Sequence, residues 1–105
     1  MKKNTKNLSA DVMRENAEKA ELLLKQLANT RRLMILCALM EGEKTVNDLV
    51  KAADLSQSAL SQHLAKMRAA KLLASEKRGQ MVYYSISSMQ AQALLSTLCV
   101  MYCKS

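Results

Sequence analysis

The fold is decided by the stretch SQSALSQHLAKMRAA at residues 56–70. Ser56 is a good helix N-cap, because its hydroxyl can accept a hydrogen bond from a first-turn backbone N–H. At 100° per residue, Leu60, Leu64 and Met67 gather on one side of the predicted helix. The opposite side is polar and almost uncharged, with Ser58, Gln62, Ala65 and Ala69 at its centre and Ser61 and Lys66 on its flanks. A face that only meets water usually carries Glu and Lys, so this face is typical of a contact surface.

A second short helix precedes this stretch. Thr45 and Asp48 have the spacing of a capping box, with Asp in place of Glu, which predicts a helix over residues 46–53. A tight turn at Asp54 and Leu55 then leads into the helix that Ser56 caps. Two short helices joined by so tight a turn are typical of a helix-turn-helix.

A β-hairpin follows. Residues 73–78 and 81–86 are expected to form two strands, since Val82, Tyr84 and Ile86 alternate with Tyr83 and Ser85. Gly79 lies at the first central position between them, which suits a type II′ turn. This hairpin would form the wing of a winged helix-turn-helix.

Three further helices are expected around this unit. The first runs over about residues 9–28, the second is capped by Asn29 or Thr30 and ends near Gly42, and the last runs from Ser87 or Ser88 to about Cys103. The last is apolar around its whole circumference, which predicts burial on every side, partly against a second copy. We therefore expect a mainly α winged helix-turn-helix domain over residues 9–105, a flexible basic tail at residues 1–8, and a homodimer through the terminal helices.

Size and charge narrow the function. The 105 residues suffice for one domain, and the net charge of +7 suits an anionic partner such as nucleic acid or a membrane surface. The longest apolar run, residues 33–40, is too short to span a membrane, and the N-terminus lacks the apolar stretch of a signal peptide. We expect a cytoplasmic bacterial protein, at the nucleoid when bound to DNA, with no membrane partner.

Double-stranded DNA fits the helix at 56–70. A Gln amide can form two hydrogen bonds with an adenine edge, and Ser and Ala allow close approach to the groove floor. Between residues 44 and 84 there are seven basic and three acidic side chains, and two of the basic ones lie beside the wing turn. For His63 we expect an interhelical or phosphate hydrogen bond rather than a metal ion. The predicted DNA contacts are Gln57, Ser58, Ser61, Gln62, His63, Lys66, Lys77 and Arg78.

Residues 55–68, LSQSALSQHLAKMR, resemble the recognition helix of the ArsR/SmtB family of bacterial repressors. The resemblance extends to residues 27–33 and 82–84 and covers about residues 14–103. It implies an operator-binding repressor, not an enzyme, that responds to metals or reactive small molecules. Lys71 stands where the family usually has Gly, and a left-handed Lys would be strained there. The family's frequent Pro near Asn29 is also missing.

The resemblance also guides the choice of sensor. The Cys-x-Cys of arsenic- and cadmium-type members is absent from residues 45–49, and residues 89–104 lack the Asp, His and Glu ligands of zinc-type members. No metal site and no cofactor are therefore predicted. Cys37 and Cys103 resemble the dithiol of the persulfide- and redox-sensing branch, which includes BigR, SqrR, YgaV and HlyU. This implies that reactive sulfur species or oxidants link the two cysteines and release the operator.

Several alternatives stay open. Cys37 shares an apolar stripe with Leu33 and Leu36, so it could be a small core residue. Cys99, one turn before Cys103, could be a third redox thiol, a filler at the dimer interface, or one ligand of a thiolate metal sensor with Cys37 and Cys103. A thiol enzyme lacks support from any Cys-x-x-Cys, phosphate loop or Ser/His/Asp set. A DNA architectural protein that senses nothing is a further possibility.

Overall fold

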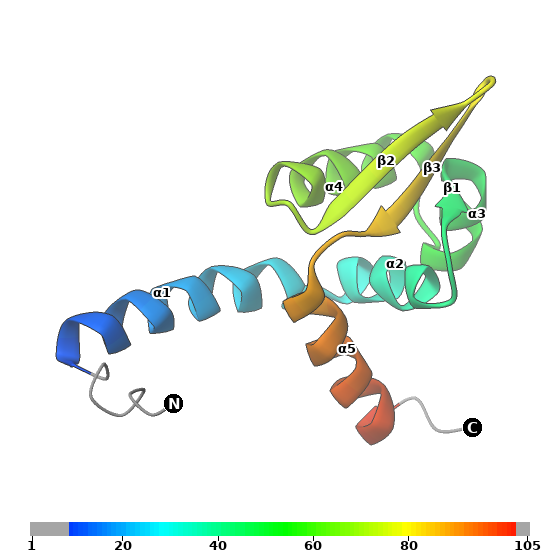
Figure 1. The fold of residues 1–105 in the computed structure, drawn as a ribbon. Helices are drawn as coiled ribbons and strands as arrows, with labels where there is room; N and C mark the ends of the chain where they lie inside the picture. The colour runs from blue at the N-terminus through cyan, green and yellow to red at the C-terminus, as the bar shows by residue number, and fades with distance from the viewer. Residues whose placement is uncertain (1–8, 103–105) are drawn as a thin grey trace.

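The computed structural model describes residues 9–102, which form five helices and three strands (Figure 1). They are α1 (Ala10–Leu27), α2 (Thr30–Met40), β1 (Lys44–Thr45), α3 (Val46–Ala53), α4 (Gln57–Ala69), β2 (Leu73–Arg78), β3 (Met81–Ile86) and α5 (Met89–Tyr102). The predicted fold class, a mainly α winged helix-turn-helix, is confirmed. The expected tail at residues 1–8 and Cys103 lie outside the described residues.

Each helix begins where a short polar side chain accepts a hydrogen bond from a backbone N–H in the first turn. The caps and their donors are Ser9 with Val12 at 3.2 Å, Asn29 with Arg32 at 3.1 Å, Thr45 with Asp48 at 3.3 Å, Ser56 with Ala59 at 3.2 Å, and Ser88 with Ala91 at 3.0 Å. The Thr45 backbone N–H also donates to the Asp48 carboxylate, which completes the predicted capping box. The helix starts are therefore fixed by local sequence.

The core lies between α2, α3 and α4. Its largest fully buried side chains are Ile35, Leu36, Leu49, Leu60, Leu64 and Met67. Three of these are the apolar residues predicted for the inner side of α4, so that prediction is confirmed. Leu27 of α1 and Leu95 of α5 join the same cluster and hold the terminal helices to it.

The wing is the predicted hairpin with one strand more than expected. Arg78 pairs with Met81 at its tip, and Gly79 between them has a φ of +61°, as the first central position of a type II′ turn requires. The sheet order is β1-β3-β2, with Thr45 of β1 opposite Tyr83 of β3. The expectation of a two-stranded sheet is wrong, because the residues that lead into α3 pair with the outer side of β3. This strand ties the wing to the helix-turn-helix.

Lys71 follows Ala70, the C-cap residue of α4, and adopts the left-handed conformation, with a φ of +64°. The Leu72 N–H donates to the Met67 carbonyl, and the Lys71 N–H donates to the Arg68 carbonyl, each at 2.9 Å. These two bonds make a Schellman motif, in which the position of Lys71 is usually Gly. The strain expected for a non-glycine residue is therefore present, and buried Leu72 follows it as the motif's apolar anchor.

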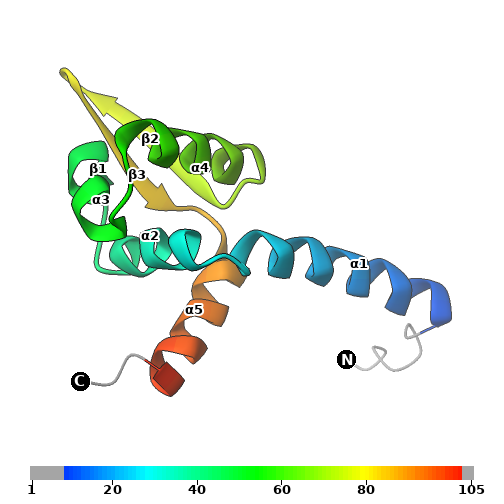
Figure 2. The same ribbon diagram turned by 180° about the vertical axis from the view of Figure 1, so that it is seen from behind.

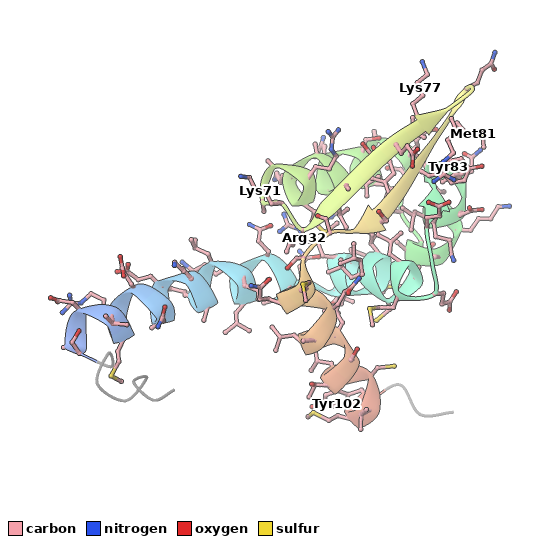
Figure 3. The ribbon with its side chains drawn as sticks, in the orientation of Figure 1. Arg32, Lys71, Lys77, Met81, Tyr83 and Tyr102 are labelled. Carbon is pink, nitrogen blue, oxygen red and sulfur yellow. The ribbon has the colours of Figure 1, made fainter. Side chains whose placement is uncertain are left out.

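The two terminal helices project from the body of the molecule, as the opposite views of Figures 1 and 2 agree. Leu27 is the sole buried residue of α1, and Ala91 and Leu95 are the buried residues of α5. The end of α5 is exposed, including Tyr102 (Figure 3). One chain thus covers only part of a helix that the sequence predicts to be buried all round. No helix within residues 9–102 is long and apolar enough to span a membrane.

Candidate nucleic-acid interface

The outer face of α4 is a polar surface without acidic side chains. Its exposed residues are Gln57, Ser58, Ser61, Gln62, Ala65, Lys66 and Ala69. The Ser56 hydroxyl that caps the helix lies 3.5 Å from the Ser58 hydroxyl. Amide and hydroxyl groups both donate and accept hydrogen bonds, and the Ala and Ser side chains leave room for a close partner. The sequence-predicted contacts on α4, apart from half-buried His63, are thus brought together on one accessible face able to hydrogen-bond base edges.

Arg31 holds the turn between α3 and α4. Its Nη1 donates to the Ala53 carbonyl at the end of α3, at 3.2 Å, and lies 3.9 Å from an Asp54 carboxylate oxygen. Asp54 itself adopts the left-handed conformation, with a φ of +54°. Arg31 therefore positions α4 from α2. Sequence reasoning missed this role, because no local pattern marks where a long side chain finds its partner.

His63 lies on the flank of α4 and is half-buried. Its Nδ1 accepts a hydrogen bond from Arg32 Nε of α2, at 3.3 Å. Burial lowers the pKa of His63 most, and the positive charges of Arg32 and Lys66 lower it further. The interhelical hydrogen bond expected for this side chain is therefore present. Among residues 9–102, no three His, Cys, Asp or Glu side chains form a cluster that could hold a metal ion.

The two basic residues of the wing differ in their surroundings. Lys77 is exposed and projects outward near the hairpin tip (Figure 3), and it pairs with no acidic side chain in the described part of the chain. Arg78 Nη2 instead donates to Glu43 at 2.8 Å and to Glu76 at 2.9 Å, and its guanidinium lies 4.6 Å from the Tyr83 ring centroid. The hydrogen bonds that Arg78 donates to the Glu43 and Glu76 carboxylates raise the pKa of Arg78, and the bonds that Glu43 accepts from Arg78 lower the pKa of Glu43. In this structure Lys77 is the wing cation left open to a phosphate.

The two described cysteines lie on α2 and α5, away from this surface. Cys37 of α2 is exposed, so its interpretation as a buried core residue is wrong, although its neighbour Leu36 is fully buried. Cys99 of α5 is also exposed, and α5 packs against α2. Cys103 follows directly after α5 and lies outside the described residues. A solute can reach Cys37, as a reactive thiol requires.

A broad groove of about 1380 Å³ separates the second half of α1 from the start of α5. Leu22 and Leu23 line it on one side and Met89 and Ala93 on the other, with Leu72 after the end of α4 also contributing. The groove is mainly apolar and open. It thus continues the exposed apolar surface of the terminal helices.

Residues 29–75 match the family described as bacterial regulatory protein, arsR family. These residues comprise α2, the helix-turn-helix and the first part of β2. The family match therefore includes α4 and the polar surface on its outer face.

Full-length relatives extend the likeness to most of the chain. The transcriptional activator HlyU of Vibrio cholerae is 46% identical over 92 residues, which are 88% of this chain and 85% of HlyU. The HTH-type transcriptional regulator YgaV of Escherichia coli is 39% identical over 87% of this chain and 93% of its own length. These relatives are transcriptional regulators by name.

Solved structures agree. Reduced HlyU of Vibrio cholerae has a TM-score of 0.84 over 88% of this chain and 97% of that one, at 46% identity. The transcriptional repressor BigR of Xylella fastidiosa has a TM-score of 0.82 over 93% of this chain and all of that one, at 28% identity. The likeness includes both terminal helices as well as the helix-turn-helix.

Proposed function

The chain belongs to the ArsR family of bacterial regulatory proteins and is a transcriptional regulator, and from this premise we propose that it is a homodimeric repressor whose operator is released when Cys37 and Cys103 become linked. The observation that carries the DNA-binding part is the outer face of α4. It offers Gln and Ser side chains, with small Ala residues between them and no acidic group. Lys66 and Lys77 flank it with positive charge for the phosphates.

The homodimer is proposed from the surface of the terminal helices. Leu22 of α1 is 66% exposed and Val100 of α5 is 75% exposed, and the apolar groove lies between these helices. A large apolar surface on a small chain usually marks an interface. A two-fold dimer would cover it and would place two α4 helices in successive major grooves of a symmetric operator. The +7 charge of each chain would be doubled, so binding is expected to weaken steeply with salt.

The sensing part is proposed from Cys37 and from the position of α5. Cys37 is exposed on α2, and α5, which packs on α2, ends one residue before Cys103. Sulfane sulfur would convert one thiol into a persulfide, and attack by the other thiolate would join the two residues and release hydrogen sulfide. An oxidant such as peroxide would instead take two electrons and two protons from the two thiols. A solved structure of the HlyU relative is described as reduced, which supports thiol chemistry in this branch.

The test of DNA binding uses a site selected from a random duplex library and read by fluorescence anisotropy. Gln62→Ala is expected to weaken binding about tenfold and to relax the base preference. The matched control is Gln92→Ala on α5, which removes the same amide away from α4 and leaves binding unchanged. An equal loss in both variants would contradict the role of α4.

The test of sensing uses mass spectrometry after treatment with sodium polysulfide, peroxide or zinc. A mass that joins Cys37 to Cys103, with or without added sulfur, is expected together with loss of DNA binding. Cys37→Ser should bind DNA and no longer respond, whereas the control Cys99→Ser should still respond. Zinc bound stoichiometrically by the three thiols would instead favour the thiolate metal sensor. An unaltered response in Cys37→Ser would sink the proposal.

A further inference from the structure

A chain of hydrogen bonds joins α1, α2 and α4 at His63. Arg32 Nε donates to His63 Nδ1 at 3.3 Å, and Arg32 Nη1 donates to the Gln26 side-chain oxygen at 2.7 Å and to its carbonyl at 3.4 Å. All three side chains are half-buried, and Arg32 lies near the junction of α1 and α2 (Figure 3). Gln26 thus orients the guanidinium, and the guanidinium orients the imidazole.

This arrangement fixes which ring nitrogen of His63 carries the proton. A guanidinium only donates hydrogen bonds, so Nδ1 must be the unprotonated acceptor and Nε2 must carry the hydrogen of the neutral ring. Burial together with the charges of Arg32 on α2 and Lys66 on α4 lowers the pKa of His63, which keeps the ring neutral near pH 7. Within residues 9–102, no carboxylate takes part in these hydrogen bonds. Because Arg32 occupies Nδ1, the neutral His63 ring can donate a hydrogen bond from Nε2–H.

The place of His63 suggests what this donor meets. The ring follows Gln62 on the flank of α4, away from the centre of the outer face. When a helix enters the major groove, its centre faces the bases and its flanks face the sugar–phosphate walls. We propose that Arg32 is a positioning residue that holds His63 as a neutral Nε2–H donor to a DNA phosphate oxygen. The inference rests on the proposed DNA-binding function.

Two substitutions separate the two ring nitrogens. His63→Asn retains an acceptor near Nδ1 for Arg32 but removes the donor, and His63→Gln retains a donor near Nε2. His63→Asn is expected to weaken binding to the selected duplex about five- to tenfold, and His63→Gln less. The salt dependence should not change, because a neutral donor displaces no counterion. A smaller loss in His63→Asn than in His63→Gln would overturn the proposal.

A double-mutant cycle tests whether Arg32 acts through His63. Arg32→Lys keeps the positive charge but loses the planar guanidinium that bonds His63 and Gln26 at the same time. It should therefore weaken DNA binding in the native background and have little further effect in the His63→Asn variant. The matched control is Arg31→Lys, the same change one residue earlier, because the Arg31 guanidinium donates to the Ala53 carbonyl and not to His63. Its effect should add to that of His63→Asn. Additive effects for Arg32→Lys as well would overturn the positioning role.

Nuclear magnetic resonance gives a reading that does not depend on DNA. His63 is the one histidine of the chain, so its two ring nitrogens give unambiguous signals. The native protein is expected to show the Nε2–H form at neutral pH, and Arg32→Lys a mixture of both neutral forms. A native Nδ1–H form would overturn the inference and leave the proposed function standing. Failure of the native protein to bind any selected duplex would contradict the proposed function itself.

Discussion

Arg78 of the wing is held by both carboxylate oxygens of Glu43, a residue 35 positions earlier in the connection between α2 and β1. Glu76 and the ring of Tyr83 contact the same guanidinium. The tip half of the wing is therefore tied to the connection between α2 and β1 by charge, in addition to the β1–β3 ladder. The same ion pairs withhold the charge of Arg78 from any phosphate.

Glu43→Gln is expected to raise DNA affinity by about two- to fivefold, with a salt slope that is steeper by about one, because Arg78 becomes available to a phosphate. The measurement is anisotropy over a range of salt concentrations. The control is Glu41→Gln, which removes an equal charge from the same connection. It breaks the ion pair with Lys44 and leaves the ion pair between Glu43 and Arg78 in place. Weaker binding by Glu43→Gln would mean that Arg78 serves DNA binding by bracing the wing.

Lys71→Gly is expected to stabilise the fold by about 1 kcal/mol. Glycine relieves the left-handed strain, and the higher conformational entropy that it gives the unfolded chain offsets only part of this gain. Chemical denaturation measures the change as a shift of the midpoint at constant slope. The control is Lys66→Gly inside α4, where the same substitution should destabilise by about 1 kcal/mol. A loss of stability in Lys71→Gly would contradict the Schellman geometry.

Asp48 should make stability depend on pH. Hydrogen bonds from the Thr45 backbone and side chain lower the pKa of Asp48 from its ordinary 3.8. The stabilisation is therefore complete above the pKa of the unfolded state and is lost as pH falls through the lower folded value. The stability difference between the native chain and Asp48→Asn should shrink as pH falls from about 5 toward 3.

Thermal unfolding across this pH range measures the difference. Thr45→Ser, which keeps the hydroxyl of the capping box, is expected to behave like the native chain. A difference between the native chain and Asp48→Asn that stays constant down to acid pH would show that the carboxylate contributes no charge-dependent stability.

Leu22→Ser and Val100→Ser test the proposed dimer. Each removes exposed apolar surface from a terminal helix, so the monomer should fold while the dimer dissociation constant rises about tenfold or more. Sedimentation equilibrium measures the constant, and Thr97→Ser on exposed polar surface of α5 is the control. Dissociation constants equal to that of the native chain in both apolar variants would place the interface elsewhere.

Local chemistry explains how much of the fold the sequence predicts. Ser56 and the Thr45–Asp48 pair act within one turn of themselves, so their helices begin where expected, and Gly79 sets the hairpin in the same way. Strand β1 was missed because two residues carry no periodic pattern, and its partners in β3 lie far along the chain.

In the candidate site, too, local features could be predicted from the sequence and long-range contacts could not. The outer face of α4 follows from helical periodicity, and its residues are exposed as predicted. The partners of Arg31, Arg32 and Arg78 do not follow from periodicity, because a long side chain reaches a place that only the folded chain defines. Core packing of Cys37, which the apolar stripe allows as an alternative, is wrong, because the edge of such a stripe is buried only if another element covers it.

The exposed length of α1 has a consequence for the isolated chain. Residues 10–26 contain no buried side chain, and a helix with so few tertiary contacts is only marginally stable in water. Its backbone amides should therefore exchange with deuterium quickly in dilute protein and slowly when a partner covers them, while those of α2 and α4 stay protected throughout. The exchange rate of the α1 amides then reports dimer formation as the protein concentration rises, because α1 becomes fully helical only when a second copy covers it.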